Sequence, residues 1–143
     1  MANEILLKSR TTITAQGDGT ALTADVDPNG AYTGDTPVVL DNTYDGGTEN
    51  CFGADYLNLE LNVTTAPGTE ANAEIWYSIS EDGTNYTKWK YSHTVGDAIA
   101  ISADRYAAGI FFLSANYTKL VVVAKDYGFN AQLLATPKLH EAQ

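Results

Sequence analysis

The sequence contains little of what defines several common protein classes. Its 143 residues include a single cysteine, Cys51, which excludes an internal disulfide framework and a four-cysteine zinc site. No apolar run approaches the roughly 18 residues of a membrane span, and no basic and then apolar segment follows Met1. We therefore expect no membrane partner, no secretory signal, and a reducing cytoplasm in which Cys51 is a small buried apolar side chain.

Basic residues are also scarce. The chain has 8 Lys and Arg against 18 Asp and Glu, which gives a formal net charge of −10. Between Thr11 and Thr87 it has no base at all but thirteen acids. Such a surface repels phosphate backbones, so nucleic acid is not expected as a partner. Simple solubility is the favoured interpretation of this acidity, ahead of docking on a basic surface.

Helical periodicity is the third absence. No long stretch places apolar residues at i, i+3, i+4 and i+7, whereas the frequent Gly, Tyr, Thr and Val are typical of strands and turns. We expect an all-β fold in which eight or nine short strands form an antiparallel β-sandwich or jelly roll. Residues 1–143 are expected to form one domain, with residues 1–16 as a candidate extended N-terminal arm.

Two stretches predict strands most clearly. From Asp55 to Thr65, apolar residues alternate with polar ones, which predicts a strand with one face in the core. From Asn72 to Ser92, two alternating runs flank a polar turn at 81–85, which predicts a β-hairpin. The second strand of this hairpin is expected at 86–92.

The remaining elements are predicted from shorter signals. Strands are expected at 11–16, 20–26, 37–41, 98–102, 110–115, 117–125 and 129–136, with a loop at 93–97. One helical turn is expected at 103–108, because Ser102 is a weak N-cap and Gly109 follows its end.

Catalytic chemistry has few candidates. His93 and His140 are the only histidines, and Ser92 and His93 are neighbours on a presumed strand end, so their side chains are expected to diverge. No G-x-S-x-G, H-E-x-x-H, P-loop or dinucleotide-binding motif is present. The sequence therefore predicts no enzyme activity, no catalytic residues and no cofactor.

One segment partly matches a calcium-binding loop. Asp25, Asp27 and Asn29 place oxygen ligands two residues apart before a glycine. The match fails at its twelfth position, where Thr36 stands in place of a bidentate carboxylate. A plain Asx/Pro turn is the favoured interpretation, and the three residues are only a weak metal candidate.

The hairpin also contains both tryptophans of the chain. Trp76 lies among polar residues on the expected outer face and forms, with Tyr86, a candidate exposed aromatic patch on which a sugar ring can stack. The alternative is that the aromatics of the hairpin are core residues that pair across the two strands, Trp89 and Tyr91 with Ile75 and Tyr77.

A further pattern joins two longer segments. The first is E-I-W-Y-S-I-S-E-D-G-T-N-Y-T-K-W (Glu74 to Trp89), and the second is R-Y-x-x-G-I-F-F-L-S-A-N-Y-T-K-L-V-V-V-A (Arg105 to Ala124). Together with a final hairpin, they resemble small virion proteins of tailed bacteriophages, most closely capsid decoration or cement proteins with a jelly-roll fold. The resemblance covers about residues 55–136, and Lys119 stands where Arg is usual in the late strand.

The resemblance implies a non-enzymatic structural protein of the virion, made in the host cytoplasm and placed on the capsid surface. It implies the major capsid protein as partner, subunit bridging as the means of stabilisation, and a homo-oligomer, either a dimer or a trimer. The alternatives are a phage tail or baseplate component and a carbohydrate-binding module that uses the exposed aromatics. The expected capsid contacts come from the N-terminal arm and a weakly patterned loop: Ile5, Leu6, Lys8, Arg10, Tyr44 and Phe52.

Overall fold

A computed structural model describes residues 13–14, 21–22, 37–43, 51, 53–65, 71–99, 103–125 and 129–138. All regular elements in these ranges are strands: β1 (Ile13–Thr14), β2 (Ala21–Leu22), β3 (Val39–Asp41), β4 (Tyr56–Thr65), β5 (Ala71–Ser80), β6 (Lys90–Ile99), β7 (Arg105–Phe112), β8 (Tyr117–Lys125) and β9 (Phe129–Lys138). Within these residues there is accordingly no helix of the length and apolarity that crossing a bilayer requires.

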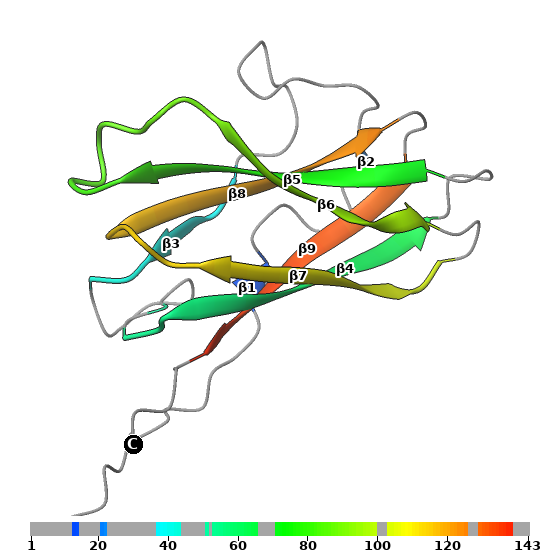
Figure 1. Ribbon diagram of the computed structural model, residues 1–143, viewed down its shortest axis with the longest axis horizontal. Helices are drawn as coiled ribbons and strands as arrows, with labels where there is room; N and C mark the ends of the chain where they lie inside the picture. The colour runs from blue at the N-terminus through cyan, green and yellow to red at the C-terminus, as the bar shows by residue number, and fades with distance from the viewer. Residues whose placement is uncertain are drawn as a thin grey trace, which may run out of the picture.

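The strands form two antiparallel sheets that pack against each other (Figure 1). One sheet has the order β1-β9-β4-β7, with β2 also paired to β9, and the other has the order β3-β8-β5-β6. The sequence prediction of an all-β sandwich is confirmed. Every strand pair in both sheets is antiparallel, which is why no crossover helix is needed.

The core lies between the two sheets and follows the alternation of the long strands. On β4, Leu57, Leu59, Leu61 and Val63 are buried, as the sequence predicts. The other strands supply the rest of the same cluster, chiefly Ala73, Ile75, Leu120, Val122, Phe129, Ala131 and Leu133. Cys51 is buried in this cluster, which confirms its predicted place.

The second strand of the hairpin lies later in the chain than predicted. β6 runs from Lys90 to Ile99, so the prediction of a strand at 86–92 followed by a loop at 93–97 is wrong. Thr87 is instead held beside β5, because its N–H donates to the Ile79 carbonyl (3.0 Å) and its carbonyl accepts from Ser78 Oγ (2.5 Å). These bonds keep residues 86–89 in an irregular connection, and regular pairing with β5 begins only at Lys90.

The predicted helical turn at 103–108 is also wrong, since β7 begins at Arg105 and continues to Phe112. Gly109 has a φ of 85°, which is the conformation that suggested a helix end. Here the same conformation belongs to a β-bulge, in which Ala108 and Gly109 together face Leu59 of β4.

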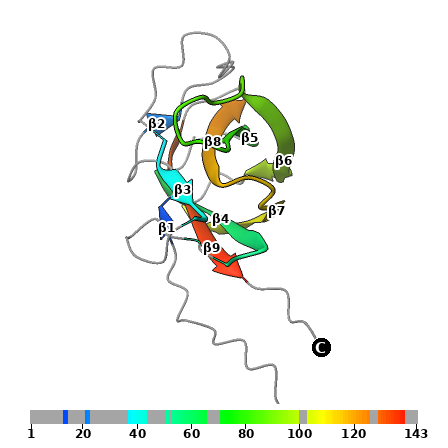
Figure 2. The same cartoon turned by 90° about the vertical axis from the view of Figure 1, so that its left-hand side faces the viewer.

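β6 and β7 are the last strands of their sheets and lie on the same side of the sandwich (Figure 2). We call this side the β6–β7 edge. Among the described residues, neither strand has a neighbour in its own sheet on its outer side. The side chains that the two strands direct outward therefore decide what this edge can contact.

Candidate functional site

Most of the residues expected to bind a partner lie outside the described residues. This applies to the predicted capsid contacts Ile5, Leu6, Lys8, Arg10, Tyr44 and Phe52 and to the metal candidates Asp25, Asp27 and Asn29. The two described candidates are Trp76 and Tyr86, and both are partly buried.

Trp76 lies on the face of β5 opposite the core residue Ile75. Its indole packs edge-on against the Tyr91 ring, with centroids 5.9 Å apart, and its Nε1 donates to Glu74 Oε1 (3.2 Å). The register pairs Tyr91 with Trp76 and His93 with Ile75. The core pairing of Tyr91 considered from the sequence is therefore wrong, because Tyr91 is on the outer face, where 43% of it is exposed.

Tyr86 lies next to β8, whereas the Trp76 ring packs against Tyr91 of β6. Lys119 Nζ is 3.8 Å from the centroid of the Tyr86 ring, so an ammonium group covers one face of it. Partial burial, and then the nearby Tyr117, Asp41 and Asp82, raise the pKa of Tyr86 above its ordinary value. One face of this ring is thus already occupied within the chain.

The loop between β5 and β6 is a compact turn built around Asp82. Its Oδ1 accepts hydrogen bonds from Ser80 Oγ (3.0 Å) and from the N–H groups of Thr84 and Asn85 (both 2.8 Å), and its Oδ2 accepts from Asn85 Nδ2 (2.7 Å). These bonds, led by those from Asn85, hold the pKa of the Asp82 carboxyl well below its usual range. The S-x-D-G motif of the sequence is therefore a self-contained turn.

The lowered pKa of Asp82 predicts how the stability of the fold changes as the pH falls. The native pKa of Asp82 is lowered, so its stabilising effect is complete above roughly pH 4, the pKa of an unfolded aspartate, and is lost progressively as the pH falls below it. We expect the thermal midpoint of Asp82→Asn to fall less steeply than wild type between neutral and acidic pH. Glu81→Gln, which removes the adjacent exposed carboxylate, is the matched control. Parallel profiles for wild type and Asp82→Asn would contradict the prediction.

The same turn docks on the start of β8. Asn116 Nδ2 donates to the Glu81 carbonyl (3.0 Å), and a Cβ on Gly83, whose φ is 75°, would lie 3.1 Å from the Tyr117 ring. The two segments that carry the family resemblance thus contact each other here. Glycine at position 83 is required both by its backbone angle and by the closeness of the Tyr117 ring.

A hydrogen-bond chain joins β6 to β7 at the centre of the β6–β7 edge. His93 Nε2 lies 2.6 Å from the Ala108 carbonyl, and its Nδ1 lies 2.8 Å from Ser92 Oγ. Because a carbonyl only accepts, neutral His93 carries its proton on Nε2, and the Ser92 hydroxyl donates to Nδ1. The expectation that Ser92 and His93 diverge is wrong, because the β5–β6 register shifts at this point and the strand is no longer regularly pleated.

Exposed apolar side chains gather beside this chain of bonds. The described residues include four exposed large hydrophobic side chains, and three of them, Tyr91, Ile110 and Phe112, belong to β6 and β7. We call these three the edge patch. Ile110 is 52% exposed and Phe112 is 73% exposed. Such a concentration on one side of a small domain marks a contact surface more often than solitary apolar residues do.

A shallow hollow of about 280 Å³ lies within the edge patch, and Tyr77, Phe111, Ser92 and Ser114 complete its lining. The rings of Tyr77 and Phe111 meet edge-on at 5.0 Å between centroids. The hollow is slightly smaller than the roughly 300–1,000 Å³ typical of small-molecule pockets. It has room for a protruding side chain of a partner.

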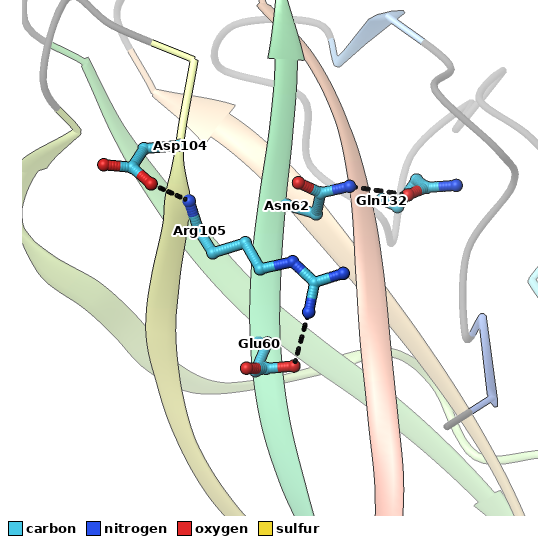
Figure 3. Close-up of polar contacts among 5 residues, drawn as sticks. All are labelled: Glu60, Asn62, Asp104, Arg105 and Gln132. Carbon is cyan, nitrogen blue, oxygen red and sulfur yellow. Dashed lines mark hydrogen bonds and ion pairs between the residues drawn. The ribbon is translucent and has the colours of Figure 1, made fainter. Parts of the chain in front are cut away.

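The outer face of the β1-β9-β4-β7 sheet carries polar pairs away from Ile110 and Phe112. Figure 3 shows an ion pair between Arg105 of β7 and Glu60 of β4 (3.6 Å), and an amide pair in which Asn62 Nδ2 donates to Gln132 Oε1 (2.8 Å). Such cross-strand pairs are usual on the solvated face of an antiparallel sheet. In the described part of the chain, no three His, Cys, Asp or Glu side chains gather as a metal-ligand set.

Comparison with known proteins adds no relative. No protein-family model matches the chain, and searches of curated proteins and of solved structures found no significant similarity. The family resemblance therefore rests on the sequence motifs, and the function has to be argued from the surface of the sandwich.

Proposed function

We propose that this chain is a non-enzymatic structural protein of a tailed-phage virion, which binds the outside of the capsid and stabilises it by bridging major capsid subunits. The observation that carries the proposal is the edge patch. Three of the four exposed large hydrophobic side chains of the described residues lie in it, and two of these, Tyr91 and Phe112, are aromatic side chains of the kind enriched in protein interfaces. Such a surface supports a protein as the partner.

Two further features support the choice of a virion. The motif segments on which the resemblance rests, Glu74–Trp89 and Arg105–Ala124, are in contact through Glu81, Gly83 and Tyr117. The turn that recurs in the resembled proteins is therefore tied to the late strand that accompanies it. A capsid also offers many identical sites, so that modest single contacts suffice when several act together.

The proposal predicts saturable binding to expanded, undecorated phage heads. In a co-sedimentation assay, the wild-type chain should bind at a fixed ratio to the major capsid protein, and deletion of residues 2–12 should abolish binding while leaving the circular dichroism spectrum and thermal midpoint unchanged. Absence of binding by the wild type would refute the proposal. A ratio of only a few copies per particle would instead assign the chain to a tail or baseplate.

Carbohydrate binding is the second candidate, and the Trp76–Tyr91 pair favours it. An edge-on aromatic pair beside the Glu74 carboxylate combines an apolar ring surface with a hydrogen-bond acceptor, which are the two elements that sugar recognition uses. A glycan array with wild type and Trp76→Ala distinguishes the two functions. A glycan signal that disappears in Trp76→Ala, together with no binding to heads, would favour this candidate.

A further inference from the structure

We propose that the edge patch joins two copies of this chain about a twofold axis, with Phe112 of each copy entering the hollow of the other. The pairing uses the edge patch that supports the proposed function and names a second copy of the chain as its partner, so other surfaces of the pair would contact the capsid. It needs no other protein and is tested without capsids. A dimer bound to the capsid would carry two copies of the surface that contacts the shell, and could therefore bridge two capsid subunits.

The surface is complementary to itself. A twofold contact brings the same patch of two molecules together, so a protruding group and a matching recess must lie side by side on one molecule. Phe112 is the most exposed large apolar side chain of the described residues. It borders the hollow whose lining includes the Tyr77 and Phe111 rings. A phenyl ring from a second copy would thus contact aromatic side chains on entry.

The charge distribution also favours a second copy as the occupant. Each chain carries a net charge of −10, and a twofold contact places like residues near one another. From Tyr106 to Asn116 the sequence Y-A-A-G-I-F-F-L-S-A-N contains no charged residue. This segment includes both β7 members of the edge patch. The segment itself therefore brings no carboxylate into a contact between two strongly acidic molecules.

Only part of β7 has the protection that is usual for an edge strand of a monomer. Exposed edges are commonly shielded by charged side chains, proline, bulges or a covering segment. β7 has its bulge at Ala108 and Gly109, but beyond it Ile110 and Phe112 are exposed with neither a charge nor a proline beside them. A second copy would cover this apolar end of the strand.

Sedimentation velocity of the full chain tests the pairing. Wild type should form a dimer whose fraction rises with concentration, and Phe112→Asp should raise the dimer dissociation constant at least about 30-fold, the effect of losing one strong interface side chain. The matched control is Val39→Asp, which changes the fourth exposed apolar side chain, on β3 at the opposite edge of its sheet. Circular dichroism and thermal midpoints verify that both variants fold.

A second variant gives a positive signal. Phe112→Cys should form an intermolecular disulfide under mild oxidation, because the two positions lie close to the twofold axis, and Cys51 is buried and does not compete. Val39→Cys should remain uncrosslinked under the same conditions. A dimer band on a non-reducing gel for the first variant alone is the expected result.

Two outcomes would overturn the pairing: a wild type that stays monomeric at all concentrations, and a Phe112→Asp variant as dimeric as wild type. If the wild type is monomeric and Phe112→Asp loses binding to heads, the edge patch would be assigned to the shell. A dimer that forms normally but does not bind heads would leave the pairing intact and refute only the capsid function.

Discussion

Replacing Gly109 with alanine is expected to destabilise the fold by about 2–3 kcal/mol. A left-handed backbone conformation costs a non-glycine residue about 1–2 kcal/mol, and Gly109 has a φ of 85°. An added Cβ would also lie 2.9 Å from His93 Nε2, so the imidazole must move. Moving it breaks the bond to the Ala108 carbonyl, which contributes about 0.5–1.5 kcal/mol. Urea unfolding of wild type and variant measures the difference.

His93→Ala provides the matched background for this prediction. Without the imidazole, Gly109→Ala should cost only the backbone term, about 1–2 kcal/mol, because there is no longer a side chain for the new Cβ to displace. The two substitutions should therefore be less than additive. An equal cost in both backgrounds would mean that the His93 contact does not matter, and a cost near zero in wild type would contradict the bulge itself.

Gly109 also shows where sequence analysis reaches its limit. A glycine after a short run of residues fits the end of a helical turn and a β-bulge equally well, since both require a positive φ. The residues that decide between them are distant: Leu59 across the sheet and His93 across the edge. No local signal in the segment around Gly109 contains that information.

The strands with one buried face were the most predictable. β4 was predicted almost to its ends, because four apolar residues alternate with polar ones and only a period of two fits them. The hairpin shows the opposite case. Tyr86 to Trp89 also alternate, yet Thr87 bonds to Ser78 and Ile79 in an irregular connection, and these bonds depend on the turn at Asp82. Alternation alone does not fix where pairing begins.

The edge patch was not predicted, and its residues explain why. In the run I-F-F-L, alternation says that neighbouring side chains point to opposite faces, but not which face is covered. Phe111 is 7% exposed and Phe112 is 73% exposed, although the two are chemically identical. Phe111 belongs to the core cluster between the sheets, whereas Phe112 points to the outer face, and only the folded structure shows which of the two faces is covered. An uncharged stretch in a very acidic chain was the one available signal.

A large loss of stability, about 2–5 kcal/mol, is expected for the core substitution Leu61→Ala. Leu61 is fully buried at 0% exposure, and it pairs with Tyr106 of β7 on one side and Leu133 of β9 on the other. Shortening its isobutyl side chain to a methyl group leaves a cavity between the two neighbouring strands, because the close-packed interior relaxes only partially. Because domains of this kind are stabilised by only about 5–15 kcal/mol, the thermal midpoint should fall visibly.

Asn58→Ala on the same strand is the control, because Asn58 is exposed on the outer face and its replacement should change stability by no more than about 0.5 kcal/mol. A cost below about 1 kcal/mol for Leu61→Ala would mean that the sheets do not close over β4 as described.

The comparison of Leu61→Ala with Phe112→Asp also bears on the edge patch. Leu61 holds β7 to the core through Tyr106, so its loss should weaken dimer formation in proportion to the unfolded fraction, whereas Phe112→Asp should weaken it in a fully folded protein.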